Sequence, residues 1–507
     1  MKDSYKTITS DLHKLATGSV LAFSGSILGN GIIYLIGIFI ARLMGAEVVG
    51  YFFLALVFMQ IVSAVCRVGL PEGLLRFVAI HVGNNDYPRV KGTIFSAITV
   101  GGINSLIASI FIIIFLDFIS FRLIKQPGIY LFLKWFAVSL PFFSVFVLIL
   151  YSIQAYKRME LVVLFRDIVQ PTAMLVIAFV LYYYFLRSPI CFPVAYFGSI
   201  IIVLASSAYF LFRISPALKR KISAVYEWKT LLIFSLPITL SDIAYYSFRW
   251  FDSFLISYFR TSSEIGIYNA ALRTTLLLNL LAVSVNALFA PIIAEHHHQG
   301  KKEQINLLLK TMTRWSLTVA LPIVFAMSLF SNDILYFWGP QFTEGSTALI
   351  LLALAQLMFI LSSLMAFNLI MCGKQYIEIG ITITITIFNI IVNLLMIPAY
   401  GINGAAIAML ISQIIAFLLR VFGVQYSLGI GLYTQKYFKP ILAFLPVLVV
   451  FLVLQKSLMN IAFSIFKSHV FTLVIMFLLI VIVYLTFLYI LKFEKEDLLI
   501  WKELRNQ

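Results

Sequence analysis

The stretch YYSFRWFDSFLISYF, residues 245–259, is apolar almost throughout, yet it contains Arg249 and Asp252. Apolar sequence reaches back to Leu231 and, after a short break, continues to Leu272. About 20 consecutive apolar residues allow a helix to cross a bilayer. An arginine near the middle of such a helix costs about 2.5–3.5 kcal/mol on insertion scales, so one that is kept there indicates a functional or structural partner.

The composition of the whole chain has the same character. Of 507 residues, 62% are hydrophobic and 11% are charged, whereas soluble domains contain about 25% charged residues. No glycine-rich nucleotide loop occurs, which argues against ATP hydrolysis. Cys66, Cys191 and Cys372 are isolated in apolar sequence and are expected to be packing residues. We therefore expect an integral membrane protein without cofactor or metal that is not an enzyme.

The apolar runs predict an all-α, polytopic fold with about fourteen transmembrane helices. No loop between them is long enough to form a further domain. The predicted helices cover residues 18–42, 47–70, 92–116, 129–153, 161–186, 190–212, 231–258, 265–293, 306–330, 345–371, 378–398, 401–424, 438–455 and 469–491.

Lysine and arginine are distributed unevenly between the two sets of loops. An even helix count puts both termini on one side, and that side holds most of the 37 basic residues. Positive charge marks the cytoplasmic side. We predict that both termini and the loops at 81–91, 213–230 and 296–305 are cytoplasmic, while 331–346 faces outward. The net charge of +16 follows from this bias, so it requires no nucleic-acid partner.

The sequence contains traces of an internal repeat. LMGAEVVGYFFLALVF (43–58) aligns with FRTSSEIGIYNAALRT (259–274), and IQAYKRMELVVLF (153–165) aligns with IMCGKQYIEIGIT (370–382). The two similar separations predict two six-helix bundles followed by two additional helices. The predicted parts are the terminal segments 1–17 and 492–507, the bundles 18–212 and 231–424, the linker 213–230, and the extra helices in 425–491.

Four stretches resemble the polysaccharide and lipid-linked oligosaccharide flippases of the multidrug/oligosaccharidyl-lipid/polysaccharide (MOP) exporter superfamily. They are ARLMGAEVVGYF (41–52), VGLPEGLLRFVA (68–79), SSEIGIYNAALR (262–273) and IPAYGINGAAIAMLIS (397–412). The resemblance implies two bundles around a central cavity, and alternating access across the cytoplasmic membrane. It also implies a glycan substrate carried on a polyprenyl phosphate or diphosphate, contact with membrane lipids, and glycan-assembly enzymes as partners.

Charged residues on predicted helices seven and eight form our predicted substrate site. Asp242 and Arg249 are seven residues apart and share a helix face, and Asp252 lies within pairing distance of Arg249. Arg273 lies at a depth similar to that of Arg249, and Asn269 precedes it by one turn. Because guanidinium groups bind phosphate oxygens well, we predict substrate contacts by Arg249, Arg273, Asn269 and Asp252. Asp242 and Asp252 are candidates for ion coupling. An Arg249–Asp252 pair that only stabilises helix seven is the alternative.

Three further charges flank the cytoplasmic end of predicted helix two: Arg67, Glu72 and Arg76. They are candidates for an inner gate that collects the diphosphate. A snorkelling or loop-bound role is equally compatible with the sequence.

Other features have simpler interpretations. Arg166, Arg314 and Arg420 lie towards cytoplasmic helix ends and are expected to snorkel to the membrane surface. Gly25-x-x-x-Gly29 predicts a close contact between helices. Prolines expected to kink helices are Pro141, Pro171, Pro237 and Pro322.

The leading interpretation is an ATP-independent flippase for a lipid-linked oligosaccharide or polysaccharide precursor. One alternative is a drug or metabolite exporter of the same superfamily, which would prefer small organic cations. The other is a membrane-embedded glycosyltransferase or polymerase, which would incorporate labelled sugar when purified.

Overall fold

The structure, a computed structural model, is helical along most of the chain that it describes. It describes the backbone of residues 2–429, 431, 435–466 and 469–491, and side chains from residue 24 onward except at 240–242, 244–249, 284, 287–288, 290–291, 430, 432–435, 452, 454–470 and 492–507. Contacts divide the chain into two compact units, Met1–Ala270 with Asn393–Ile402, and Ala271–Val392 with Asn403–Gln507. The bundle limits predicted from the sequence remain predictions.

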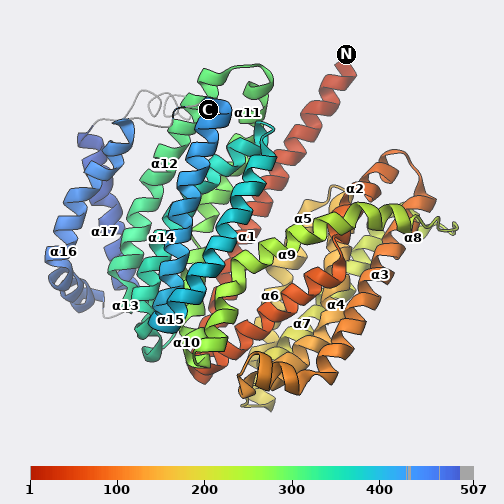
Figure 1. Cartoon of the computed structure of the whole chain (residues 1–507), viewed down its shortest axis with the longest axis horizontal. Coiled ribbons are helices and arrows are strands. Elements are labelled where there is room, and N and C mark those ends of the chain that lie inside the picture. Colours follow the sequence, from red (N-terminus) through yellow and green to blue (C-terminus); the bar gives the residue numbers. More distant parts are fainter. Residues whose placement is uncertain (1, 430, 432–434, 467–468, 492–507) are drawn as a thin grey trace. The chain divides into compact units, whose positions relative to one another are not determined.

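The first unit consists of long helices joined by short turns, and α4 packs between α3 and α7 (Figure 1). Its elements are α1 (Lys2–Arg67), α2 (Leu70–Gly83), α3 (Tyr87–Ile114), η1 (Phe118–Leu123), η2 (Pro127–Ile129), α4 (Tyr130–Ala155), α5 (Met159–Val163), η3 (Leu164–Val169), α6 (Gln170–Val180), η4 (Leu181–Phe185), α7 (Cys191–Ile214), α8 (Pro216–Lys219), α9 (Trp228–Phe259) and the first part of α10 (Ser262–Leu276).

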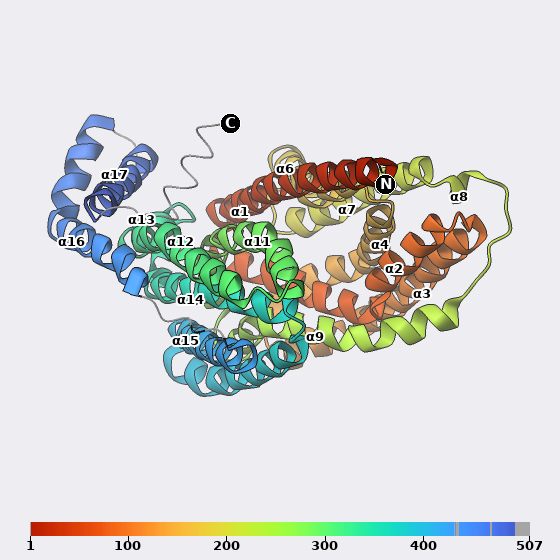
Figure 2. The same cartoon turned by 90° about the horizontal axis from the view of Figure 1, so that it is seen from above.

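The second unit continues from α10, and α16 and α17 lie side by side in it (Figure 2). Ala326 of α12 shares an apolar core with Val447 of α16 and Ile480 of α17. Its elements are α11 (Asn279–His298), α12 (Lys302–Leu329), α13 (Ser331–Tyr336), η5 (Pro340–Gly345), α14 (Ser346–Met371), the larger part of α15 (Gln375–Leu428), η6 (Gln435–Tyr437), α16 (Phe438–Phe466) and α17 (His469–Ile490).

Two of the helical elements are broken by a glycine. Gly45 in α1 has φ 82°, and Gly401 in α15 has φ 58°. Residues with a Cβ rarely adopt such positive φ values, whereas glycine does so at little cost. Gly45 lies between the predicted helices 18–42 and 47–70, and Gly401 is the first residue of the predicted helix 401–424. We therefore infer that α1 and α15 each provide two membrane crossings.

The hydrophobic helices agree with the predicted membrane spans. By length and composition, ten helices among the described residues can cross a membrane, and two of these, Ser24–Arg67 and Gln375–Leu428, are 44 and 54 residues long. Shorter apolar helices cover Trp228–Thr239 and Phe438–Phe451. If each double-length helix counts as two crossings and the two shorter helices are added, the ten helices become the fourteen predicted spans. The predicted all-α, polytopic membrane fold is confirmed.

Small residues allow helices of the first unit to approach closely. The Ser63 and Ser144 hydroxyls of α1 and α4 are 2.8 Å apart, and Ser109 of α3 donates to the Ala137 carbonyl of α4 at 2.6 Å. Hydrogen bonds of this kind between small residues are typical of membrane helix packing. The three cysteines are buried and free, as expected of packing residues.

Candidate functional site

A charged pair on η3 lies inside a membrane-spanning segment of the first unit. The Arg166 guanidinium donates from Nε to Asp167 Oδ1 at 2.7 Å and from Nη2 to Oδ2 at 2.9 Å. Ser26 of α1 donates to the same Oδ2 at 3.2 Å. The Arg166 side chain is 52% exposed and that of Asp167 15%, so the arginine forms the open side of the pair.

The irregular backbone below this pair follows from Pro171. A proline inside a helix has no N–H, and its ring clashes with the carbonyl of the residue four positions earlier, which here is Asp167. The helix widens into a π-helical turn over Leu164–Val169 before α6 begins at Gln170. Single π-helical turns inside α-helices are frequent at functional sites.

Two glycines allow α1 to pack against this turn. A Cβ at Gly29 would overlap the carbonyl oxygen of Asp167, and a Cβ at Gly25 would overlap the Val163 side chain. The close helix contact predicted for Gly25-x-x-x-Gly29 is therefore confirmed. Because α1 comes so near, Ser26 reaches the Asp167 carboxylate.

Asn30 extends the polar surface along α1. Its side chain is exposed, and its amide donates to the Ser26 carbonyl at 2.7 Å. Arg166 lies seven residues after Met159, the first residue of α5, which corresponds to about 10 Å along the span. A half-exposed charge at this depth is stable in water but costly in hydrocarbon. Ser26, Asn30, Arg166 and Asp167, together called the polar face, form a polar surface inside this span.

The polar face has the chemistry of a phosphate site. Arg166 Nη1 is the guanidinium nitrogen that Asp167 does not use, and guanidinium groups bind phosphate oxygens through paired hydrogen bonds. The Ser26 hydroxyl and the Asn30 amide add neutral polar groups beside it. Asp167 orients the guanidinium and balances its charge.

Two of the predicted substrate contacts are buried inside the first unit. Asp252 of α9 is 7% exposed, and its carboxylate accepts hydrogen bonds from the Tyr268 hydroxyl and from the Ser253 amide, the latter at 2.7 Å. Asn269 is fully buried, and its amide donates to the Ile265 carbonyl at 3.0 Å. The bond from Tyr268 to Asp252 connects α10 to α9, whereas the bond of Asn269 stays within α10. Direct contact of Asp252 or Asn269 with a substrate stays a prediction.

The predicted substrate site also includes three other charged residues, Asp242, Arg249 and Arg273. The side chains of Asp242 and Arg249 lie outside the described part of the structure. Arg273 belongs to the second unit, where it is partly buried. The common level predicted for Arg249 and Arg273 therefore remains a prediction.

The predicted inner-gate residues differ from one another in their surroundings. Arg67 is 5% exposed and donates to the Ser63 hydroxyl at 2.5 Å, so the snorkelling alternative is wrong for it. Arg76 is exposed, with its guanidinium 4.5 Å from the centre of the Phe234 ring of α9. Glu72 is partly buried. A gate formed by these residues stays a prediction.

The second unit contains a buried ion pair. Arg420 Nη2 lies 2.6 Å from Glu378 Oε1, and the two side chains are 12% and 9% exposed. Arg420 Nη1 donates to the Ser362 hydroxyl of α14 at 2.6 Å. This pair connects the two halves of α15 to α14, and its contacts are those of a structural brace.

The prediction that basic residues near helix ends snorkel is wrong for Arg314 and Arg420, which are 5% and 12% exposed. Arg420 stays inside because Glu378 neutralises it, and Arg166 is likewise held by Asp167. Two sequence signals were available. Asp167 adjoins Arg166, and Glu378 begins the helix that a short turn places antiparallel to the helix of Arg420.

Two family models match the chain. The model described as polysaccharide biosynthesis protein matches residues 15–297, and the model described as MatE matches residues 237–402. Among curated proteins, the probable low-salt glycan biosynthesis flippase Agl15 of Haloferax volcanii is 26% identical over 206 residues. That alignment covers 40% of this chain and 43% of the relative, so it spans less than half of the relative's length.

Solved structures share the fold. The lipid II flippase MurJ in an inward closed conformation superposes with a TM-score of 0.76 at 17% identity, covering 96% of this chain and all of that one. An inward-facing multidrug resistance MATE family transporter of the MOP superfamily gives a TM-score of 0.69 at 15% identity, covering 81% and 98%. At these identities the likeness concerns the fold alone.

Proposed function

We propose, since this chain belongs to the polysaccharide biosynthesis protein family, that it moves a lipid-linked glycan precursor across the cytoplasmic membrane. The movement runs from the inner to the outer leaflet by alternating access, without ATP hydrolysis and with both termini in the cytoplasm. The glycan is carried on a polyprenyl phosphate or diphosphate, and glycan-assembly enzymes act before and after the translocation. The name of the flippase relative in Haloferax volcanii supports this substrate class.

The polar face is the observation that carries the proposal. A phosphate-linked glycan has a polar head that cannot cross hydrocarbon. The protein that moves it must therefore supply a hydrated path, with a cation along this path for the phosphate. Arg166 supplies a half-exposed cation about 10 Å inside the span. A diphosphate that binds there can accept a hydrogen bond from Arg166 Nη1, the nitrogen that Asp167 does not use, while Ser26 and Asn30 add neutral polar groups.

Alternating access would require a set of hydrogen bonds in the first unit to break and form again. Gln126, between η1 and η2, donates to the carbonyls of Ser257 and Arg260 at 3.1 and 2.9 Å and accepts from the Ser262 hydroxyl. On the predicted topology, these contacts close the outer ends of α9 and α10 against the first bundle. Release of the glycan to the outside requires them to separate.

Arg249, Arg273, Asn269 and Asp252 remain proposed as further substrate contacts. Asp242 and Asp252 remain the proposed carriers of a coupling ion. The bond from Tyr268 to Asp252 suits that role, because protonation of the carboxylate would weaken the link between α9 and α10. Arg67, Glu72 and Arg76 remain proposed for the inner gate.

A second candidate function, export of drugs or metabolites, is favoured by the MatE match at residues 237–402. Binding to the purified protein separates the two. In native mass spectrometry, a polyprenyl-diphosphate-linked oligosaccharide should bind and displace bulk phospholipid, while small organic cations should not. Binding of the cations without binding of the glycolipid would support the exporter and contradict our proposal. Incorporation of labelled sugar would instead support a glycosyltransferase or polymerase.

A further inference from the structure

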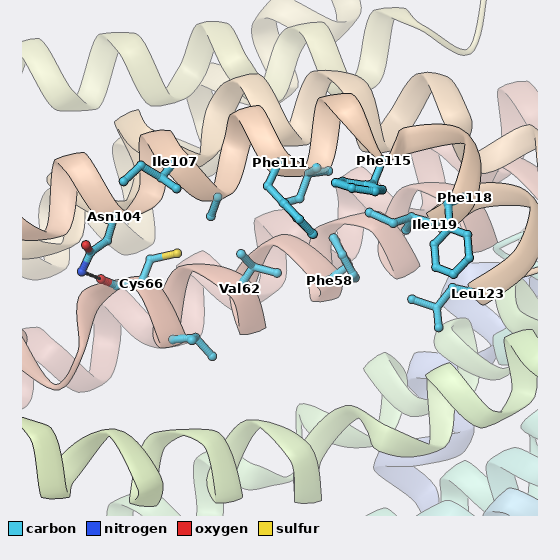
Figure 3. Close-up of a pocket in the computed structure, with 13 residues that line it drawn as sticks. Phe58, Val62, Cys66, Asn104, Ile107, Phe111, Phe115, Phe118, Ile119 and Leu123 are labelled. Atoms are coloured by element: carbon cyan, nitrogen blue, oxygen red, sulfur yellow. Dashed lines mark hydrogen bonds between the residues drawn. The ribbon is translucent and has the colours of Figure 1, made fainter.

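The first unit contains an apolar groove that the polar face does not use. It lies between the second half of α1 and the second half of α3, ends at η1, and has a volume of about 810 Å³ (Figure 3). Its walls include Phe58, Val62 and Cys66 of α1, Phe111 of α3, and Phe115 directly after α3. This volume is within the range of about 300–1,000 Å³ that is usual for ligand sites.

The walls of the groove leave little for a polar ligand to bind. Asn104 is the lining residue with a polar side chain, and its amide donates to the Cys66 carbonyl at 3.1 Å (Figure 3). That hydrogen bond closes one end of the groove and satisfies the amide. The remaining wall is aromatic and aliphatic, so the ligand section that fits here is a hydrocarbon.

The groove is elongated and open to the side. Asn104 of α3 and Phe115, the residue after α3, are eleven residues apart, or about 16 Å at 1.5 Å per residue. Phe111 is 57% exposed and Leu123 is 55% exposed. Because the outer surface of α3 is apolar, this opening faces the bilayer interior, and a chain can enter the groove without leaving hydrocarbon.

The far end of the groove carries two basic residues, Arg122 and Lys125, and one exposed acidic residue, Asp117. Leu123 closes the lining there, and Arg122 and Lys125 flank it with exposed side chains. The Lys125 ammonium lies 3.9 Å from the centre of the Tyr258 ring of α9. On the predicted topology this end of the groove lies at the outer side of the membrane, where basic residues are few. A pair of cations at the end of an apolar groove therefore indicates a ligand. It fits an anionic head joined to a hydrocarbon chain.

We propose that this groove holds the polyprenyl chain of the lipid carrier on the outer side, with its phosphate at Arg122 and Lys125. The proposal rests on the proposed function and adds a site for the chain that is separate from the polar face. The aromatic side chains Phe58, Phe111, Phe115 and Phe118 form a broad apolar wall that a hydrocarbon chain can contact along its length. Capture of the chain here would retain the carrier while the glycan leaves the cavity.

A groove-filling variant tests the proposal with a sugar-free polyprenyl phosphate as the probe. Ala108 lines the groove, whereas Ile103 lies outside the lining on the same helix and is 52% exposed. In native mass spectrometry, Ala108→Trp should lower the affinity for polyprenyl phosphate at least tenfold, and Ile103→Trp should leave it unchanged. Arg122→Gln with Lys125→Gln should weaken binding of polyprenyl phosphate but not of polyprenol.

Two binding results would overturn the proposal. One is wild-type affinity in Ala108→Trp, and the other is equal competition by phosphatidylglycerol, which would identify the groove as an ordinary phospholipid site. Either result leaves the proposed function intact if the wild-type protein still translocates a lipid-linked glycan. Failure of the wild-type protein to translocate a lipid-linked glycan would instead contradict the proposed function. A benzophenone on the polyprenyl chain should label residues 107–118 in the wild-type protein, and labelling confined to other helices would also contradict the groove.

Discussion

Gly50 of α1 and Gly266 of α10 lie backbone to backbone where the two helices cross. A Cβ at Gly50 would overlap the Ser262 carbonyl oxygen, and a Cβ at Gly266 would overlap the Ala46 carbonyl oxygen. The two glycines occupy equivalent positions in the aligned stretches LMGAEVVG and FRTSSEIG. The contact is thus nearly symmetric, which supports the internal repeat and identifies the point at which the repeated helices meet.

This crossing should not tolerate a methyl group. Gly50→Ala and Gly266→Ala should each lower the free energy of unfolding by about 1–3 kcal/mol, because backbone atoms cannot rotate away from the added Cβ. Gly31→Ala is the matched control on α1, since a Cβ there meets nothing within 4 Å. It should stabilise the helix by up to about 1 kcal/mol. Thermal unfolding in detergent measures all three, and equal behaviour of Gly50→Ala and Gly31→Ala would show that the helices do not cross here.

The Arg420–Glu378 pair should be a structural element of the second unit. Arg420→Met leaves the Glu378 carboxylate buried without its cation and should lower the free energy of unfolding by about 3–5 kcal/mol. Adding Glu378→Met should restore most of that loss, because no charge remains buried. Arg158→Ala is the control, since its pair with Glu160 is exposed at 53% and 42%, and it should change stability by at most about 1 kcal/mol. A double variant as unstable as Arg420→Met would contradict the pairing.

The polar face should be accessible to water. In a background without the three native cysteines, Asn30→Cys should react quickly with a charged, water-soluble thiol reagent. Ile114→Cys is the control, because Ile114 is 69% exposed but lies on the apolar surface of α3. It should react slowly, since a thiol in hydrocarbon is neither ionised nor reached by the reagent. Comparable reaction rates of the two cysteines would contradict access of water to the polar face.

The orientation in the membrane can be tested in intact cells. Cysteines placed in the loops at 81–91, 213–230 and 296–305 should be protected from an impermeant reagent, and those in 331–346 should be labelled. The reason is the excess of lysine and arginine on the side of the termini. Labelling of 213–230 under the same conditions would reverse the topology and would place Arg122 and Lys125 on the cytoplasmic side.

The membrane spans could be predicted from the sequence because hydrophobicity is a property of each segment by itself. The breaks at Gly45 and Gly401 also have local signals, since each glycine lies between two apolar runs. The contact at Gly25 and Gly29 follows from spacing on one helix, although its partner, η3, was not evident.

The charged contacts could be predicted less well, because they depend on which helices become neighbours. Glu378 and Arg420 are 42 residues apart and meet only because the chain turns back at Gly401. Arg166 and Asp167 adjoin in sequence, but their exposure depends on how α1 covers η3. The hydrogen bond from Tyr268 to Asp252 likewise requires the register between α9 and α10.

Translocation of a lipid-linked glycan by the purified protein in vesicles tests the central claim most directly. A fluorescent polyprenyl-diphosphate-linked oligosaccharide in both leaflets reports movement through its loss of protection from an impermeant quencher. The wild-type protein should expose the protected pool much faster than protein-free vesicles, and Arg166→Ala should abolish this gain without loss of folding. Arg213→Ala, which removes an exposed arginine stacked 5.8 Å from the Tyr209 ring, should behave like the wild type. A wild-type rate no higher than that of protein-free vesicles would contradict the flippase, and an undiminished rate in Arg166→Ala would contradict the role of the polar face.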